Sequence, residues 1–403
     1  MQKFDLFPGY RGRCLVLPAL ALLACLPACS KQGSDPGTPA TPAASIANVT
    51  QERSTQAAVF HFQVSLDRAA TQDVSIQYAT VPGSAQAGKD FTTVSGTLHI
   101  TAGSLTGTID VPVSADSLRS PNKTFQVQLS NPQHCTLRTD HATGTIVDEN
   151  GLYFPVDNTG YTGADSYPGY TLVWSDEFDG NQINSGNWGF DTGNSGWGNH
   201  ELENYTNRKQ NAFVSQGNLI IEARQEDLGG SSYTSARMLT KGKKAFQYGR
   251  VDIRARMPSG KGIWPALWML GDNIDQAGWP ACGEMDILEL LGQQPDKIYG
   301  TLHWGATPAA HASKGNSYQL SGGSFDQQFH LYSLIWKQDS VQILVDDKPY
   351  LQVSRGDVTG AYPFNANFFF IFNVAVGGDW PGAPDGTTQF PQRMIVDYIR
   401  VYQ

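Results

Sequence analysis

Short runs of alternating apolar and polar residues recur along most of the chain, and they predict strands. Val59–Leu66, Thr108–Val113 and Ser340–Val345 are clear examples. Side chains on a strand point alternately to its two faces, so each run places one face in a core and the other in solvent. From residue 170 onward no periodic segment of helical length stands out. We therefore expect an all-β protein.

The runs fall into two groups, which predict two domains. Residues 45–150 contain about seven short strands, a density typical of an immunoglobulin-like β-sandwich. Residues 151–169 form a connector, and residues 170–403 hold enough strand sequence for one larger sandwich with its own core. Residues 30–44 are rich in Pro, Ala, Ser and Gly and cannot bury a core, so they predict a linker.

Residues 1–29 have the features of an export signal. Two arginines precede the apolar run Leu15–Leu26, which is too short to span a membrane. The run ends in Leu-Pro-Ala-Cys29, which resembles a bacterial lipoprotein signal with Cys29 as the acylated first mature residue. Cys25 offers a competing cleavage position, and an ordinary secretory signal is the alternative. We expect an outer-membrane lipoprotein held only by this anchor, or a secreted protein if Cys29 is not used.

Composition and charge narrow the possible partners. The net charge of −9 provides no basic face for nucleic acid, whereas a neutral polysaccharide is compatible with it. Beyond the signal only Cys135 and Cys282 remain, in different predicted domains, which argues against a disulfide framework. No His/Cys cluster has transition-metal spacing and no phosphate-binding loop is present, so we expect no cofactor for catalysis.

The second domain contains three acids set among apolar residues, Glu284, Asp286 and Glu289. On a helix these side chains would point in widely different directions. On a strand Glu284 and Asp286 share a face, and one extra residue, a β-bulge, returns Glu289 to that face. Bulges are common beside active sites, where they re-aim a side chain.

This arrangement suits a glycosidase. With the bulge, the two glutamate backbones lie about 13 Å apart. Side chains that lean together bring their carboxyl groups to about 5 Å, the separation found in retaining glycosidases. The charge of Asp286 between them would keep one glutamate protonated near neutral pH. A solvated strand face with an acidic stripe is the alternative, and spacing alone does not decide between the two.

The surrounding sequence favours catalysis, because residues 170–403 resemble glycoside hydrolase family 16. Glu284, Asp286 and Glu289 match the family motif Glu-X-Asp-X-X-Glu, in the spacing typical of bacterial laminarinases, which are endo-β-1,3-glucanases. Further matching blocks follow one another in order. They are Leu172–Asp179, Gly196–Thr206, Tyr248–Arg256, Gly262–Leu270, Gly300–Trp304, Asn373–Gly377 and Val396–Tyr402.

The resemblance implies a jelly-roll sandwich of the concanavalin A-like kind, with the substrate cleft on its concave sheet. It implies that Glu284 is the nucleophile, Glu289 the general acid/base and Asp286 the assisting residue. It also implies residues that contact the glucan, since aromatic rings cover sugar faces and polar groups bind hydroxyls. These are Asn199, Glu201, Arg237, Trp264, Trp268, Trp279, His303, Trp304 and Trp380. Trp268 lies in a segment that is apolar on both faces, so a core position is equally open for it.

Two family resemblances bear on calcium binding. The first sandwich resembles a Calx-β domain, which often binds calcium through acidic end loops. The matching acids are Asp90, Asp116, Asp148 and Glu149. The stretch after Asp116 lacks further acids, so a spacer role is favoured there. In the second sandwich the laminarinase resemblance implies a structural Ca²⁺ ion held by Glu177, the Gly217 carbonyl and Asp397, with ordinary surface acids as the alternative.

We therefore predict a monomeric cell-envelope enzyme that cleaves β-1,3-linked glucan with retention. Same-fold alternatives are hydrolases of mixed-linkage glucan or of a galactan such as agarose. A non-catalytic glucan-binding surface protein is an alternative of another class, although binding alone would not need both glutamates. An adhesin or scaffold built around the first sandwich is the third alternative.

Overall fold

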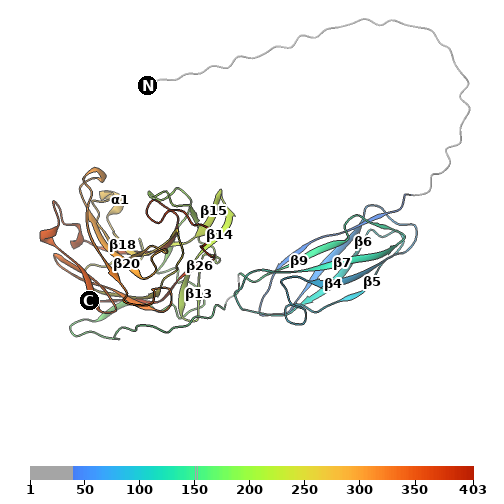
Figure 1. The fold of residues 1–403 in the computed structure, drawn as a ribbon, viewed down its shortest axis with the longest axis horizontal. Coiled ribbons are helices and arrows are strands. Elements are labelled where there is room, and N and C mark those ends of the chain that lie inside the picture. The colour runs from blue at the N-terminus through green and yellow to red at the C-terminus, as the bar shows by residue number, and fades with distance from the viewer. Residues whose placement is uncertain (1–39, 150, 152) are drawn as a thin grey trace, which may run out of the picture. The chain divides into compact units, whose positions relative to one another are not determined.

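The computed structural model describes residues 40–149, 151 and 153–403 (Figure 1). The predicted signal, its Cys29 and most of the predicted linker lie outside the described residues. Among the residues that are described, no helix is long and apolar enough to cross a membrane. Nearly all regular structure is strand, which confirms the predicted all-β class.

The first sandwich has a four-stranded sheet in the order β6-β3-β1-β8 and a five-stranded sheet in the order β2-β9-β7-β4-β5. The strands are β1 (Ala43–Ile46), β2 (Val49–Glu52), β3 (Ala58–Leu66), β4 (Val74–Pro82), β5 (Ser95–Ile100), β6 (Thr106–Val113), β7 (Lys123–Gln133), β8 (Thr136–Leu137) and β9 (His141–Val147). Burial alternates along β3, where Phe60, Phe62 and Val64 point into the core. This core consists of residues of the first sandwich alone.

The acids that match a Calx-β calcium site have cationic partners within the chain. Arg53 donates to Asp148 at 2.6 and 2.7 Å and to Asp90 at 2.9 Å, and all three residues are buried. Lys123 also donates to Asp90, at 2.8 Å. Burial by itself would raise the pKa of Asp90, but hydrogen bonds from the Gln86 backbone, Lys123 and Arg53 hold it at about 2. The charges of Asp90 and Asp148 are therefore compensated by Arg53 and Lys123.

The second sandwich, coloured from green to red in Figure 1, packs a ten-stranded sheet against a seven-stranded sheet. The larger sheet has the order β12-β15-β14-β26-β17-β22-β23-β24, with β10 and β13 paired to it off this path. Its strands are β10 (Leu172–Asp176), β12 (Glu203–Tyr205), β13 (Ala212–Ser215), β14 (Asn218–Leu228), β15 (Ser231–Ser235), β17 (Gly249–Arg256), β22 (His330–Lys337), β23 (Ser340–Val345), β24 (Lys348–Ser354) and β26 (Gln392–Tyr402).

The seven-stranded sheet has the order β11-β16-β25-β18-β19-β20-β21. Its strands are β11 (Gly189–Asp191), β16 (Arg237–Leu239), β18 (Ile263–Gly271), β19 (Glu284–Leu290), β20 (Lys297–Trp304), β21 (Ala312–Gln319) and β25 (Phe368–Val376). Helical turns are few and short among the described residues. They are α1 (Ile274–Ala277) and the 3₁₀ turns Pro308–Ala310, Arg355–Asp357 and Pro363–Asn365.

The central strand β25 shows how this sheet combines a core face with a polar face. Every residue of β25 is buried, and Phe368, Phe370 and Phe372 point into the core between the sheets. The alternate positions face the other way and include Asn373, the one polar residue of the strand. A lone amide in an apolar strand therefore marks the point where the outer face becomes a polar cleft.

The two cysteines beyond the signal, Cys135 and Cys282, are buried and free. Burial, followed by the charge of Glu284, raises the pKa of Cys282 to about 11. The thiol is therefore protonated at neutral pH, and the nucleophilic thiolate does not form.

Candidate active site

The predicted bulge is present in β19. Asp286 pairs with Thr301 of β20 and Glu289 pairs with Tyr299, so three steps along β19 match two along its neighbour. Met285 and Leu288 point into the core on either side of the irregularity. Glu284, Asp286 and Glu289 consequently all line the same cavity, as the sequence predicted.

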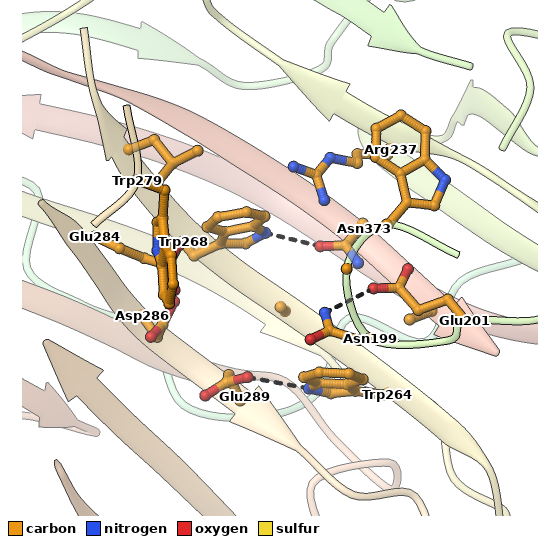
Figure 2. Close-up of a pocket in the computed structure, with 15 residues that line it drawn as sticks. Asn199, Glu201, Arg237, Trp264, Trp268, Trp279, Glu284, Asp286, Glu289 and Asn373 are labelled. Atoms are coloured by element: carbon orange, nitrogen blue, oxygen red, sulfur yellow. Dashed lines mark hydrogen bonds between the residues drawn. The ribbon is translucent and has the colours of Figure 1, made fainter. Parts of the chain in front are cut away.

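This cavity has a volume of ≈ 380 Å³ and lies on the outer face of the seven-stranded sheet. In Figure 2, Trp279, Glu284 and Asp286 lie on one side, while Asn199, Glu201 and Arg237 lie on the other. Its lining is largely aromatic, carboxylate and amide. The lining residues are Trp197, Gly198, Asn199, Glu201, Arg237, Trp264, Ala266, Trp268, Leu270, Trp279, Glu284, Asp286, Glu289, Asn373 and Ala375.

Each of the three acids is in contact with an aromatic or imidazole ring. Trp264 Nε1 donates to Glu289 Oε1 at 3.1 Å (Figure 2), and Trp279 Nε1 donates to Glu284 Oε2 at 3.2 Å. His303 Nε2 lies 3.1 Å from Asp286 Oδ2 and 3.9 Å from Glu284 Oε1. The cleft therefore positions its carboxyl groups through ring nitrogen atoms.

The electrostatics of the cavity favour protonated carboxyl groups. Burial, followed by the charge of Asp286, raises the pKa of Glu284 and of Glu289 to about 8. Burial also raises the pKa of Asp286 to about 8. Because the three carboxyls interact, their protons are shared among them, and groups that titrate near neutral pH can be present in both protonated and ionised forms. An acid and a base can thus coexist within one cleft.

A second polar group lies on the far side of the cavity. Asn199 Nδ2 donates to Glu201 Oε1 at 3.1 Å, and the Tyr205 hydroxyl donates to Glu201 Oε2 at 2.9 Å. Glu203 is fully buried, and burial, followed by the charge of Glu201, raises its pKa well above the usual value. The Asn373 amide in turn donates to the Tyr205 hydroxyl at 3.0 Å. These contacts present Glu201 and Asn199 as a fixed polar pair.

Arg237 is held between two tryptophans. Its guanidinium lies 4.9 Å from the centre of the Trp197 ring and 4.7 Å from that of Trp268, and its Nε pairs with Asp191 at 3.1 Å. Trp268 also donates from Nε1 to Asn373 Oδ1 at 2.8 Å. Trp268 therefore lies on the cleft face, which resolves the choice between cleft and core that its sequence left open.

The predicted tryptophans separate into three positions. Trp264, Trp268 and Trp279 line the cavity, and Trp279 is 39% exposed. Trp380 does not line it but lies beside it, with its ring 5.6 Å from that of Trp264. Trp304 is only 4% exposed and packs against Phe364 in the core. The prediction that Trp304 contacts substrate is wrong, because adjacent side chains on β20 point to opposite faces and His303 takes the cleft face.

The predicted calcium ligands have arginine partners in the structure. Both oxygens of Glu177 accept hydrogen bonds of 2.9 Å from Arg400, and Asp397 Oδ2 accepts one of 2.7 Å from Arg254. Gly217 lies in a turn with a φ of +69°. A calcium ion would have to compete with both guanidinium groups for these carboxylates, and the predicted calcium site stays a prediction.

Three residues near the acids were not among the predicted site residues. Trp197 and Asn373 line the cavity, and His311 contacts His303 at 2.8 Å between ring nitrogens. The sequence could have pointed to Asn373 as a site residue, since it is the one polar residue in an otherwise apolar strand. No sequence feature pointed to His311, because it follows a loop whose conformation the local sequence pattern does not predict.

Comparisons with known proteins agree with this geometry. Residues 199–400 match the family described as Glycosyl hydrolases family 16, and residues 44–150 match the Calx-beta domain. A beta-glucanase of Rhodothermus marinus is 42% identical over 252 residues, which cover 60% of this chain and 87% of that protein. A glucan endo-1,3-beta-glucosidase of Cryptopygus antarcticus is 42% identical over 226 residues, which cover 53% of this chain and 83% of that protein.

A similar solved structure is the laminarinase catalytic domain from Thermotoga maritima. It superimposes with a TM-score of 0.55 at 48% identity, and the match covers 58% of this chain and 98% of that one. The similarity in fold thus covers the sandwich that carries the three acids.

Proposed function

Because this chain belongs to the glycosyl hydrolases of family 16, we propose that its second sandwich hydrolyses β-1,3-glucosidic bonds within glucan chains. The observation that carries this proposal is the set of three carboxyls on one face of β19, with Trp279 and Trp264 donating to Glu284 and Glu289. The similar glucanases and laminarinases from other organisms support the substrate class.

The proposed mechanism is a double displacement with retention of configuration. Glu284, ionised, attacks the anomeric carbon while Glu289, protonated, gives its proton to the leaving glycosidic oxygen. A glycosyl-enzyme ester on Glu284 results. Glu289, now ionised, removes a proton from a water molecule that attacks the same carbon and restores free Glu284.

The environment of the acids is compatible with these two roles. Burial holds protons on the carboxyls near neutral pH, which supplies the general acid. Trp279 donates to Glu284 and Trp264 donates to Glu289, so each glutamate has a donor that stabilises its ionised form, which Glu284 needs for attack and Glu289 needs as the general base. Asp286 assists through its charge, which after burial is the largest cause of the raised pKa of both glutamates.

The other lining residues fit a neutral sugar chain. Trp197, Trp264 and Trp268 offer flat apolar faces of the kind that cover pyranose rings. Asn199 and Glu201 offer fixed oxygen and nitrogen atoms to sugar hydroxyls. The Nε of Arg237 is paired with Asp191 and the guanidinium lies between two indoles, so its charge in the cavity is offset by a carboxylate.

The test compares purified protein with the Glu284→Ser variant on laminarin, lichenan and agarose, by release of reducing ends and by product size. We expect rapid cleavage of laminarin to mixed oligomers, a loss of at least about 10³-fold in kcat for the variant, and unchanged laminarin binding. Asp227→Ser, at an exposed position on β14, is the matched control and should retain full activity.

Other outcomes would redirect the proposal. Cleavage confined to lichenan or agarose would keep the mechanism and change the substrate. Binding of laminarin without cleavage would replace the enzyme with a glucan-binding protein. Full activity in Glu284→Ser would remove this residue as the nucleophile.

We also propose that the enzyme is exported and held at the cell envelope by a lipid on Cys29. The support is the sequence of residues 1–29 alone, which lies outside the described residues. Labelling with a fatty acid should mark the wild-type protein and not Cys29→Ser. An unlabelled wild-type protein released into the medium would favour the ordinary secretory signal.

A further inference from the structure

One histidine outside the cavity lining, His311, contacts both rings that contact Glu284. Its Nε2 lies 2.8 Å from Nδ1 of His303, and the two rings are nearly parallel and meet edge to edge, with centroids 5.0 Å apart and an interplanar angle of 16°. Its ring also lies 4.8 Å from that of Trp279, at 36°. His311 therefore connects the imidazole and the indole beside the proposed nucleophile.

The direction of the hydrogen bond between His311 and His303 depends on the tautomers of the two rings. Burial, followed by the nearby His303, lowers the pKa of His311, so His311 is neutral at neutral pH and carries one N–H. If this N–H is at Nε2, Nδ1 of His303 accepts it, and a neutral His303 must then carry its own proton at Nε2. That proton lies on the ring nitrogen 3.1 Å from Asp286 Oδ2, a buried oxygen for which no hydrogen bond forms among the described residues.

The loop between β20 and β21 holds His311 in place. The His311 backbone N–H donates to the Pro308 carbonyl at 3.3 Å, and the Ala310 N–H donates to Thr307 at 2.9 Å. Gly305 has a φ of +144°, and a Cβ there would lie 2.4 Å from the Ala310 carbonyl oxygen. The loop is thus a compact turn in which the side chain of His311 reaches back to the edge of the His303 ring.

We propose that His311 is a positioning residue for the hydrolysis, with two separable contributions. Its Nε2–H sets the tautomer of His303 and so places a proton on the ring nitrogen that lies 3.1 Å from Asp286 Oδ2. Its ring packs on Trp279 and keeps that indole against Glu284 and facing the substrate. This inference rests on the proposed function, since its effects are measured in the rate of glucan cleavage.

Three variants of the full chain separate the two contributions. His311→Phe keeps a ring against Trp279 and removes the donor. His311→Gln places an amide N–H near the position of Nε2 and removes the ring. His311→Ala removes both, and Thr307→Ala, in the same loop with no side-chain hydrogen bond at the turn, is the control. For each protein kcat and KM on laminarin and the melting temperature would be measured.

We expect His311→Phe to lower kcat about fivefold, the effect of one net hydrogen bond, with KM within about twofold of wild type. His311→Gln should recover most of this kcat and raise KM instead. His311→Ala should change both constants, and Thr307→Ala neither. Wild-type kcat in His311→Phe, or a kcat in His311→Gln as low as in His311→Ala, would overturn the inference.

Two further results would be distinguishable from these. If all four variants lose kcat to the same extent and also lose melting temperature to the same extent, His311 acts only by stabilising the loop. That result would overturn the positioning role. A wild-type protein that binds laminarin and does not cleave it would instead refute the proposed function. The comparison of variants is therefore made only against an active wild-type protein.

Discussion

After burial, the charge of Asp286 is the largest cause of the raised pKa of Glu284 and of Glu289, the two proposed catalytic residues. Replacement by Asn removes that charge and keeps the shape, so both pKa values should fall. In the pH profile of kcat/KM, activity on the acidic limb rises as Glu284 ionises, and activity on the alkaline limb falls as Glu289 loses its proton. Both limbs should therefore move to lower pH. The measurement is kcat/KM on laminarin against pH for wild type and Asp286→Asn. Limbs that stay in place, or move upward, would contradict this account of the site.

The same acids lower the stability of the fold at high pH. Their usual pKa is about 4 and burial raises it to about 8, so the folded state binds more protons in between. The stability that these three carboxyls contribute to the fold is fully present below about pH 4 and is lost as the pH rises through about 8. Asp286→Asn cannot ionise and should melt higher than wild type at pH 8, with little difference at pH 4.

Calorimetry at the two pH values measures this effect. Asp227→Asn, an exposed acid on β14, is the matched control and should leave the melting temperature unchanged at both. A variant that is less stable at pH 8 than wild type would show that Asp286 stabilises the fold, which is opposite to the effect expected from its raised pKa.

At the scale of elements, the bulge of β19 is supported from the opposite sheet. The Tyr350 hydroxyl of β24 donates to the carbonyl of Ile287, within the bulge, at 3.2 Å. Gly300 leaves room for it, since a Cβ there would lie 2.7 Å from the hydroxyl oxygen. The irregular strand that aims Glu289 into the cleft thus has its displaced carbonyl satisfied by a tyrosine distant in sequence.

Tyr350→Phe should leave that buried carbonyl unsatisfied. We expect a loss of about 1 to 3 kcal/mol in the free energy of unfolding and a lower kcat, because Glu289 is no longer held in register. Denaturant unfolding and laminarin kinetics measure the two effects. Tyr318→Phe, on β21 with its ring 6.2 Å from that of Tyr350, is the control for loss of a tyrosine hydroxyl nearby. A stable variant with wild-type kcat would show that the bulge forms without this bond.

At the scale of the whole molecule, each sandwich has a hydrophobic core of its own. In the first, Arg53 joins Asp90 and Asp148 in a buried ion network. Arg53→Gln removes the cation and leaves two buried acids under-compensated, which should cost about 3 to 5 kcal/mol of that domain's stability. Laminarin hydrolysis by the second sandwich should be unaffected.

Calorimetry of Arg53→Gln should show a lower first transition and an unchanged second one. Arg138→Gln, an exposed arginine of the same sandwich, is the control. If one transition carries both domains, or if activity falls with the first domain, the two sandwiches do not unfold independently.

The sequence by itself determined the all-β class, the bulge in β19 and the convergence of Glu284, Asp286 and Glu289. These depend on alternation and on spacing within six residues, which are local properties of a strand. The same alternation could have excluded Trp304, since a neighbour of His303 on β20 cannot share its face.

Only the tertiary structure decided the contacts between residues far apart in sequence. His311 contacts Trp279 although β19 and β20 lie between them in the chain, Tyr350 reaches Ile287 from the other sheet, and Arg53, directly after β2, reaches Asp148, directly after β9. Such contacts depend on which strands become neighbours and in what register. That choice is made by packing of the whole sandwich, and no short pattern of apolar and polar residues encodes it.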